Sequence, residues 1–219
     1  MNNNINIRIR FSKTGSMRFI SHLDLNRTIA RAFRRAKLPI AYSEGFNPRP
    51  KLVFGLNLSI GAESICEILD TQLTHQVPFD EIITSLNKSL PENLVVYDVY
   101  TPVMPLKNIA FSEYMIEIPY STDISDKINK VFTPPVMILK HTKSSESITD
   151  ISPNILKIQP EYSDSKMTIT AVITSGNNDY LNPEYIVKVI CEHIDSGISN
   201  IDYRIIRKKV FDSQNNVFI

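Results

Sequence analysis

The sequence predicts an α+β protein in which one order of elements, β-α-β-β-α-β, occurs twice along the chain. Segments in which apolar and polar residues alternate are interleaved with segments in which apolar residues recur at helical spacing. The proline-rich segment TPVMPLK, residues 101–107, divides the chain near its middle. The length of 219 residues is sufficient for two domains of roughly 100 residues each. The order β-α-β-β-α-β is typical of the ferredoxin-like fold. We therefore expect two tandem ferredoxin-like domains, a basic one at residues 1–103 and an acidic one at residues 108–219.

The first half begins with a strand at residues 5–11, INIRIRF, in which isoleucine alternates with arginine so that one face is apolar. A turn, SKTGS, leads to a helix that Ser21 is expected to cap with Asp24, and that ends near Lys37, before Pro39. Helical spacing predicts the buried face of this helix: Leu25, Ile29, Ala32, Phe33 and Ala36. After a loop at residues 41–51, we expect strands at residues 52–58, 64–73 and 94–100 and a second helix at residues 79–90.

The second half is expected to repeat this order. Period-two alternation predicts strands at residues 110–119, 136–141, 155–159, 167–174 and 201–211. Helices are expected at residues 125–132 and 183–194. The polar segment TKSSES, residues 142–147, is expected to be a loop.

Charge is unevenly distributed, although the chain is nearly neutral with 24 Lys and Arg against 23 Asp and Glu. Residues 1–51 hold 11 basic residues and two acidic ones, Asp24 and Glu44, which gives this segment a net charge of +9. The remainder holds 13 basic and 21 acidic residues, a net charge of −8. Such asymmetry indicates an anionic partner for the basic segment.

Four arginines lie on the first predicted helix. Arg27, Arg31 and Arg34 fall at positions i, i+4 and i+7, with Arg35 beside them, away from the apolar stripe. Like charges at these spacings repel each other, and a polyanion would relieve the repulsion. The planar fork of arginine suits phosphate better than the point charge of lysine. The alternative is a solvated basic face whose charges pair with carboxylates of the acidic second half.

The loop that follows the helix, GFNPRPK, is stiffer than most loops. Pro48 and Pro50 each fix one φ angle and favour extended geometry in the residue before them. Gly45 allows a positive φ just before them. We therefore expect the loop to present Arg49 and Lys51 with little conformational entropy left to lose on binding.

Two aromatic residues, Tyr42 and Phe46, belong to the same loop region. Their rings could stack on the bases of a nucleic acid. The alternative is a well-packed turn in which Phe46 lies in the core.

His22 is the one candidate catalytic residue. It lies in the first turn of the basic helix, where it could act as a general acid or base in RNA cleavage. The alternative is a role in local hydrogen bonding or ligand contact. The remaining histidines lack metal-ligand spacing, and the sequence has no glycine-rich phosphate-binding motif, so we expect no metal and no cofactor.

The two cysteines, Cys66 and Cys191, lie far apart in apolar contexts, which is typical of reduced thiols in a cytoplasmic protein. Without a C-x-x-C or C-x-x-x-C-x-x-C motif, the chain is not expected to hold an iron–sulfur cluster by itself. No run of 18 apolar residues and no secretory signal pattern is present, so we expect no membrane partner.

Residues 10–55 closely resemble the opening of the radical-SAM-linked domain of unknown function. The motifs that carry the resemblance are FISHLDL (residues 19–25), RRAKLPIAYSEGFNPRP (residues 34–50) and ESICEILDTQL (residues 63–73). The resemblance covers residues 7–90 and is faint beyond them, where NIDYRIIRKKVF fits. In that family the domain occurs alone or fused behind a radical SAM enzyme, often encoded near a ribonuclease of the E/G type and ribosomal proteins. The resemblance implies a partner, a radical SAM enzyme in trans, with this chain as the stand-alone form.

Three hypotheses about function follow. The first is a non-catalytic RNA-binding adaptor that presents tRNA or rRNA to a radical SAM modification enzyme. The second is a metal-independent endoribonuclease, since tandem ferredoxin-like domains with a basic helix and a histidine resemble the CRISPR-repeat-processing enzymes; this sequence lacks their glycine-rich loop near the C-terminus. The third is a protein-interaction module whose arginine face docks on an acidic partner.

Overall fold

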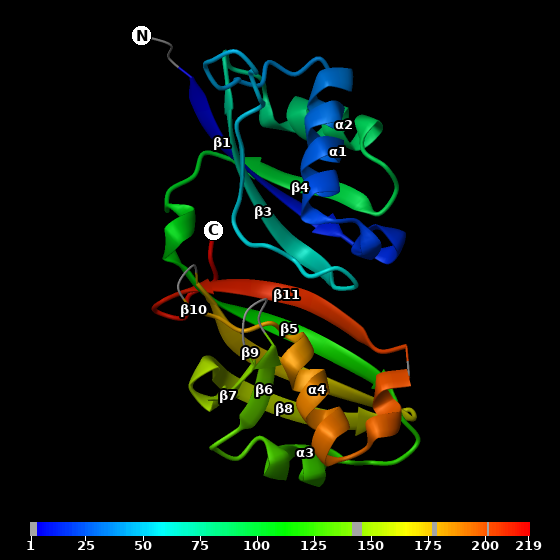
Figure 1. Ribbon diagram of the computed structural model, residues 1–219. Helices are drawn as coiled ribbons and strands as arrows, with labels where there is room; N and C mark the ends of the chain where they lie inside the picture. Colours follow the sequence, from blue (N-terminus) through cyan, green and yellow to red (C-terminus); the bar gives the residue numbers. More distant parts are fainter. Residues whose placement is uncertain (1–3, 142–145, 177–178, 201) are drawn as a thin grey trace. The chain divides into compact units, whose positions relative to one another are not determined.

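The computed structural model describes residues 4–141, 146–176, 179–200 and 202–219 (Figure 1). The chain divides into two compact units, Met1–Asn108 together with Ile219, and Ile109–Phe218. Within the described residues each unit combines an antiparallel sheet with two α-helices, so the predicted α+β class is confirmed. No helix in this part of the chain is long and apolar enough to cross a membrane.

The first unit is built on a four-stranded sheet in the order β4-β1-β3-β2, in which every neighbouring pair is antiparallel. Its elements are β1 (Ile5–Lys13), η1 (Gly15–Phe19), α1 (His22–Arg35), β2 (Leu52–Phe54), β3 (Glu63–Leu73), α2 (Phe79–Ser89), β4 (Leu94–Tyr100) and η2 (Leu106–Asn108). Helices α1 and α2 lie on one face of this sheet (Figure 1).

The alternation of β1 separates the two faces of this sheet. Ile7, Ile9 and Phe11 are buried in the core beneath the helices, together with residues of α1, α2, β3 and β4. Because successive side chains of a strand point to opposite faces, Arg8 and Arg10 lie on the face that the two helices leave uncovered. This second face carries the polar residues from which part of the candidate site is built.

The ends of α1 follow local chemistry. The Ser21 hydroxyl accepts a hydrogen bond from the Asp24 N–H at 3.1 Å and donates one to the Asp24 carboxylate at 2.7 Å, which confirms the predicted cap. At the other end Lys37 is left-handed, with φ of 54°, and the Leu38 N–H donates to the Phe33 carbonyl at 3.1 Å. This is a Schellman motif, so the helix ends in a left-handed residue two positions before the proline.

The second unit has the sheet order β8-β9-β5-β11, again antiparallel, and the two-residue strand β10 also pairs with β9. Its elements are β5 (Ile109–Pro119), α3 (Ser125–Val131), β6 (Met137–His141), β7 (Glu146–Asp150), η3 (Ser152–Asn154), β8 (Ile155–Ser163), β9 (Lys166–Gly176), β10 (Asp179–Tyr180), α4 (Glu184–His193), η4 (Ser196–Asn200) and β11 (Arg204–Asp212). Its core includes Ile116, Ile169, Ile186 and Ile190, all fully buried.

Three expectations about elements need correction. The strand predicted at residues 52–58 ends at Phe54, because the chain bends at residues 55–56. The strand predicted at residues 136–141 pairs with β7 in a separate two-stranded sheet. Strand β7 begins inside the segment expected to be a loop. Its two residues within that segment, Glu146 and Ser147, are exposed, which explains their polarity, while residues 142–145 lie outside the described part.

Candidate nucleic-acid interface

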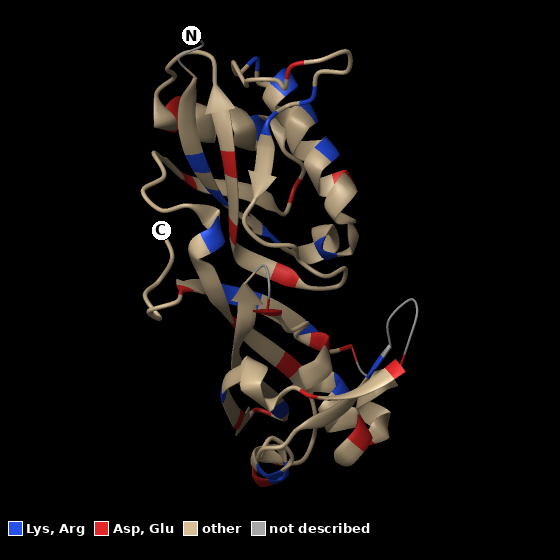
Figure 2. Cartoon of the chain, turned by 60° about the vertical axis from the view of Figure 1, so that its left-hand side comes forward, with Lys and Arg blue, Asp and Glu red and all other residues tan. Residues whose placement is uncertain are grey.

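The outer face of α1 carries the predicted arginines. Arg27, Arg31 and Arg34 are all exposed, and Figure 2 shows basic residues recurring along this helix. Arg27 lies 3.4 Å from the Asp24 carboxylate in an exposed pair of the kind that adds little stability. Within the described residues, no carboxylate lies within ion-pair distance of Arg31 or Arg34. The repulsion between these two guanidinium groups is therefore not offset by an ion pair there.

Arg35 has a different environment. Its guanidinium donates a hydrogen bond to the carbonyl of Ser89, the last residue of α2. A cation at this position satisfies one of the terminal carbonyls and suits the negative end of the helix dipole. Arg35 therefore ties α1 to α2, and it is less available to a ligand than Arg31 or Arg34.

The loop after α1 is closed on itself by its backbone. The Ser43 N–H donates to the Arg49 carbonyl at 2.8 Å, and the Arg49 N–H donates to the Ser43 hydroxyl at 3.0 Å. Tyr42 forms a bridge with Pro50 just outside this pair. Gly45, at the tip, has a φ of 121°, a positive value that glycine allows. The loop is thus a closed and stiff projection.

Phe46 lies at the tip of this loop and is fully exposed, so the alternative that places it in the core is wrong. Tyr42 is 40% exposed at the base of the loop. An exposed aromatic ring on a stiff loop loses little entropy when it stacks on a partner. Both rings are therefore available, with Phe46 the more accessible.

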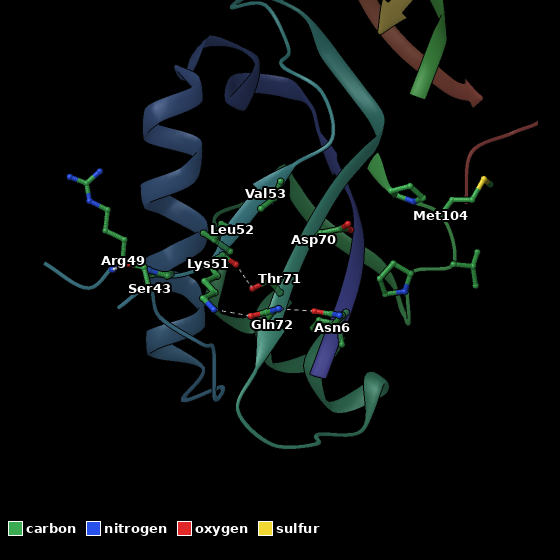
Figure 3. Close-up of a pocket in the computed structure, with 15 residues that line it drawn as sticks. Asn6, Ser43, Arg49, Lys51, Leu52, Val53, Asp70, Thr71, Gln72 and Met104 are labelled. Carbon is green, nitrogen blue, oxygen red and sulfur yellow. Dashed lines mark hydrogen bonds between the residues drawn. The ribbon is translucent and has the colours of Figure 1, made fainter. Parts of the chain in front are cut away.

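The loop also borders an open groove of about 750 Å³ that sequence reasoning did not anticipate (Figure 3). The groove lies on the sheet face that carries Arg8, and the connector at residues 102–105 forms its far side. Lys51 Nζ donates to Gln72 Oε1 at 3.1 Å, and Gln72 Nε2 donates to Asn6 Oδ1 at 2.9 Å. The three side chains form a row from Lys51, directly before β2, across β3 to β1, while the Arg49 side chain points away from it (Figure 3).

A buried ion pair fixes the floor of the groove. Arg8 is completely buried, and its Nε and Nη2 donate to the two carboxylate oxygens of Asp70 at 2.7 and 2.9 Å. Nη2 also donates to the Met104 carbonyl at 2.7 Å, which attaches the connector to the sheet. Burial by itself would lower the pKa of Arg8, but the hydrogen bonds and charge of Asp70 raise it above its ordinary value. The guanidinium is thus charged at all working pH values.

His22 is exposed, and its ring packs edge-on against the ring of Phe54 at a centroid distance of 4.8 Å. In the part of the chain that the structure describes, no hydrogen-bond partner orients its ring nitrogens. A general base is usually oriented by a third group, so this arrangement favours a packing role.

The described residues contain no group of three or more His, Cys, Asp or Glu side chains that could hold a metal ion. Cys66 is buried and Cys191 half-buried, and neither forms a disulfide within the described residues. Burial raises the pKa of the Cys191 thiol, which disfavours the reactive thiolate. The arrangement therefore offers cations, exposed rings and a polar groove for binding.

A protein-family model described as "Uncharacterized protein conserved in bacteria (DUF2344)" matches residues 6–183. No curated protein matches the chain. Among solved structures, the chain is similar to one titled "Crystal Structure of an Unknown Protein from Galdieria sulphuraria", with 8% sequence identity, 94% of this chain and 99% of that chain covered, and a TM-score of 0.28. The family match spans most of the sequence, and the chain belongs to the family DUF2344.

Proposed function

We propose that this DUF2344 protein is a non-catalytic RNA-binding adaptor that presents tRNA or rRNA to a radical SAM modification enzyme. The observation that carries the proposal is the state of Arg31 and Arg34. Both are exposed on one helix, three residues apart, with no carboxylate partner among the described residues. Phosphates of a polyanion would supply the missing counter-charges, and arginine binds phosphate in a bidentate manner.

The arrangement of the loop supports RNA over a simple polyanion. Phe46 and Tyr42 are exposed beside Arg49 and Lys51, so ring faces and cations occur in one stiff segment. Sequence-tolerant binding of single-stranded RNA combines such rings, on which bases stack, with cations that follow the backbone. Unpaired loops of tRNA and rRNA offer both features.

We also propose that each unit is a ferredoxin-like domain. The sheet order is β4-β1-β3-β2 in the first unit and β11-β5-β9-β8 in the second, where the hairpin β6–β7 and the short β10 are left out. In both orders the fourth strand along the chain lies beside the first, the first beside the third, and the third beside the second. A helix follows the first and the third of these strands in both units, as the split β-α-β motif requires. The fold by itself does not determine function.

The radical SAM partner is proposed from the sequence resemblance at residues 7–90. Two cysteines cannot ligate the cluster that radical SAM chemistry requires, so that chemistry would belong to another polypeptide. The role left to this chain is then substrate binding.

A salt titration of the purified protein against labelled tRNA and rRNA fragments tests the proposal. Four to six phosphate contacts give a slope of log K against log salt of about −3 to −5. Replacing Arg31 and Arg34 together with glutamine removes two contacts and should reduce the slope by about 1.4 to 1.8. The matched control replaces Lys127 and Lys130, an exposed pair at the same spacing on α3, and should leave the slope unchanged.

A wild-type slope near zero would refute RNA binding, and an unchanged slope in the Arg31/Arg34 variant would refute the assignment to α1. The same gels show whether the RNA is cut. Cleavage that His22→Ala abolishes would replace the adaptor by the endoribonuclease hypothesis.

A second candidate, docking on a protein partner, is favoured by a different observation. Phe19, Leu23 and Ile60 are each about 60% exposed. A hydrogen bond from the Gly61 N–H to the Arg18 carbonyl at 2.9 Å brings their segments together near the start of α1. Exposed apolar groups of this kind are typical of interaction sites. A pull-down that Phe19→Ser with Leu23→Ser abolishes, while the Arg31/Arg34 variant retains it, would support this candidate.

A further inference from the structure

The groove of the first unit has the size and composition of a small-ligand site. Its volume of about 750 Å³ lies within the range of roughly 300–1,000 Å³ that such sites occupy. Two exposed valines line it: Val53 on β2, 57% exposed, and Val103 on the connector, 76% exposed. These side chains provide apolar surface against which a flat group can lie.

The polar groups of the groove have fixed roles. The Asp70 side chain is 26% exposed and forms an ion pair with Arg8, and a carboxylate can only accept hydrogen bonds. Gln72 accepts from Lys51 and donates to Asn6, which fixes the orientation of both amides. The side-chain NH₂ of Asn6 donates no hydrogen bond to any described residue. The groove therefore offers one strong acceptor and one donor.

The cationic end of the groove is formed by the loop. Lys51 has three N–H donors, of which one is directed at Gln72. An anion can therefore bind at the loop while a polar, flat group reaches Asp70.

A peptide strand is a poor match for this surface. Strand β3 at the centre of the groove is paired with β1 on one side and with β2 on the other. Both edges of β3 are paired where this strand crosses the groove, so an extended peptide could not pair with β3 there. Recognition over β3 therefore uses its side chains, as in the binding of a nucleotide.

We infer that this groove holds one unpaired nucleotide of the bound RNA. The base lies against Val53 and Val103 with its hydrogen-bonding edge toward Asp70, and its phosphate lies at Lys51. The inference rests on the proposed function, since it assumes that RNA reaches this surface. An acceptor-only carboxylate favours guanine, which is the one base with two adjacent N–H donors on its Watson–Crick edge.

The test is to titrate the ¹⁵N-labelled protein with GMP, AMP, CMP and UMP in turn, and to monitor each titration by the amide chemical shifts. GMP should bind in the millimolar range, move resonances of β2, β3 and the connector, and bind more tightly than the other three. The blocking variant is Val53→Arg. Residue 53 is the direct cross-strand neighbour of Asp70, so the new side chain covers the carboxylate without adding negative charge.

Val53→Arg should weaken GMP binding at least about tenfold, a difference of about 1.4 kcal/mol. The matched control is Val95→Arg, which introduces the same side chain at a valine of β4 that is 47% exposed and outside the groove. It should bind GMP as the wild type does.

Two results would overturn the inference: no saturable binding of any of the four nucleotides, or equal GMP affinity in Val53→Arg and wild type. If tRNA and rRNA show a salt-dependent slope while GMP does not bind, the proposed function stands and the groove assignment fails. If GMP binds in the groove while no RNA binds, the groove assignment stands and the proposed function fails.

Discussion

The buried pair of Arg8 and Asp70 makes a quantitative prediction about the first unit. Arg8 is 0% exposed, and its guanidinium is held by two hydrogen bonds to Asp70, at 2.7 and 2.9 Å, and one to the Met104 carbonyl. Asp70→Leu removes the counter-ion but leaves the buried charge. Breaking a buried pair in this way costs about 3–5 kcal/mol of the free energy of unfolding. Since a whole domain is stable by only about 5–15 kcal/mol, this loss is large.

Removing both charges should cost much less. Arg8→Met combined with Asp70→Leu replaces the pair with apolar side chains, an exchange that is often neutral or stabilising by about 1–4 kcal/mol. The Met104 carbonyl then loses its donor, which costs about 1–3 kcal/mol. The two effects nearly cancel, so we expect the double variant to lie within about 2 kcal/mol of the wild type and to be more stable than Asp70→Leu.

These differences in the free energy of unfolding are measured within the first unit by urea unfolding, monitored through the amide resonances of β1 and β3. The matched control is Glu113→Leu in the second unit, which breaks the 3.2 Å pair with the half-exposed Lys209. Such a surface pair is worth about 0–1 kcal/mol. A loss below about 1 kcal/mol for Asp70→Leu, or a double variant less stable than that single variant, would refute the reasoning.

Two further predictions concern single side chains. Asn87 on α2 binds both backbone groups of Val96 on β4, accepting from its N–H at 2.8 Å and donating to its carbonyl at 2.7 Å. Asn87→Leu should cost about 2 kcal/mol of unfolding free energy and open the outer edge of β4 to self-association, which sedimentation velocity would detect. Asn129→Leu, at an exposed position of α3, is the control, and equal behaviour of the two variants would contradict the prediction. In the second unit, hydrogen bonds from the Ser152 N–H and hydroxyl and from the Val136 N–H lower the pKa of Asp150. A carboxyl with a lowered pKa contributes stability that is fully present above its unfolded pKa of about 3.9 and is lost as pH falls through the folded value. The urea concentration at the unfolding midpoint of this unit should therefore decrease as the pH is lowered below about 4, and it should decrease less steeply in Asp150→Asn. An identical pH dependence in the variant would show that this carboxylate is not involved.

Elements defined by local chemistry were predictable from the sequence. The cap at Ser21 and the apolar stripe of α1 depend on residues within one or two turns, and the structure has both. The positive φ of Gly45 is one that the sequence allowed, because glycine adopts it at no steric cost. The left-handed Lys37 was not predictable, since this position of a Schellman motif is usually occupied by glycine.

Features that depend on long-range pairing were missed. The groove brings together Asn6, Lys51 and Gln72, which are far apart in sequence and meet only through the register of β1, β2 and β3. The available signal was weak: polar residues at alternating positions of strands whose other face is apolar. The partner of β6 was missed for the same reason, since alternation predicts a strand but not its neighbour.

The structure also changes how the charge of the basic segment should be counted. Of its 11 basic residues, Arg8 and Lys13 are buried and Arg10 and Arg18 are half-buried, so these four are not on the open surface. Arg35 is exposed but bound to the end of α2. The cations left for phosphate are then Arg27, Arg31, Arg34, Lys37, Arg49 and Lys51. At about 0.9 released counterions per contact, they set a limit of about −5 for the salt slope. A steeper slope would require cations outside this segment, and the binding surface would then extend beyond α1 and its loop.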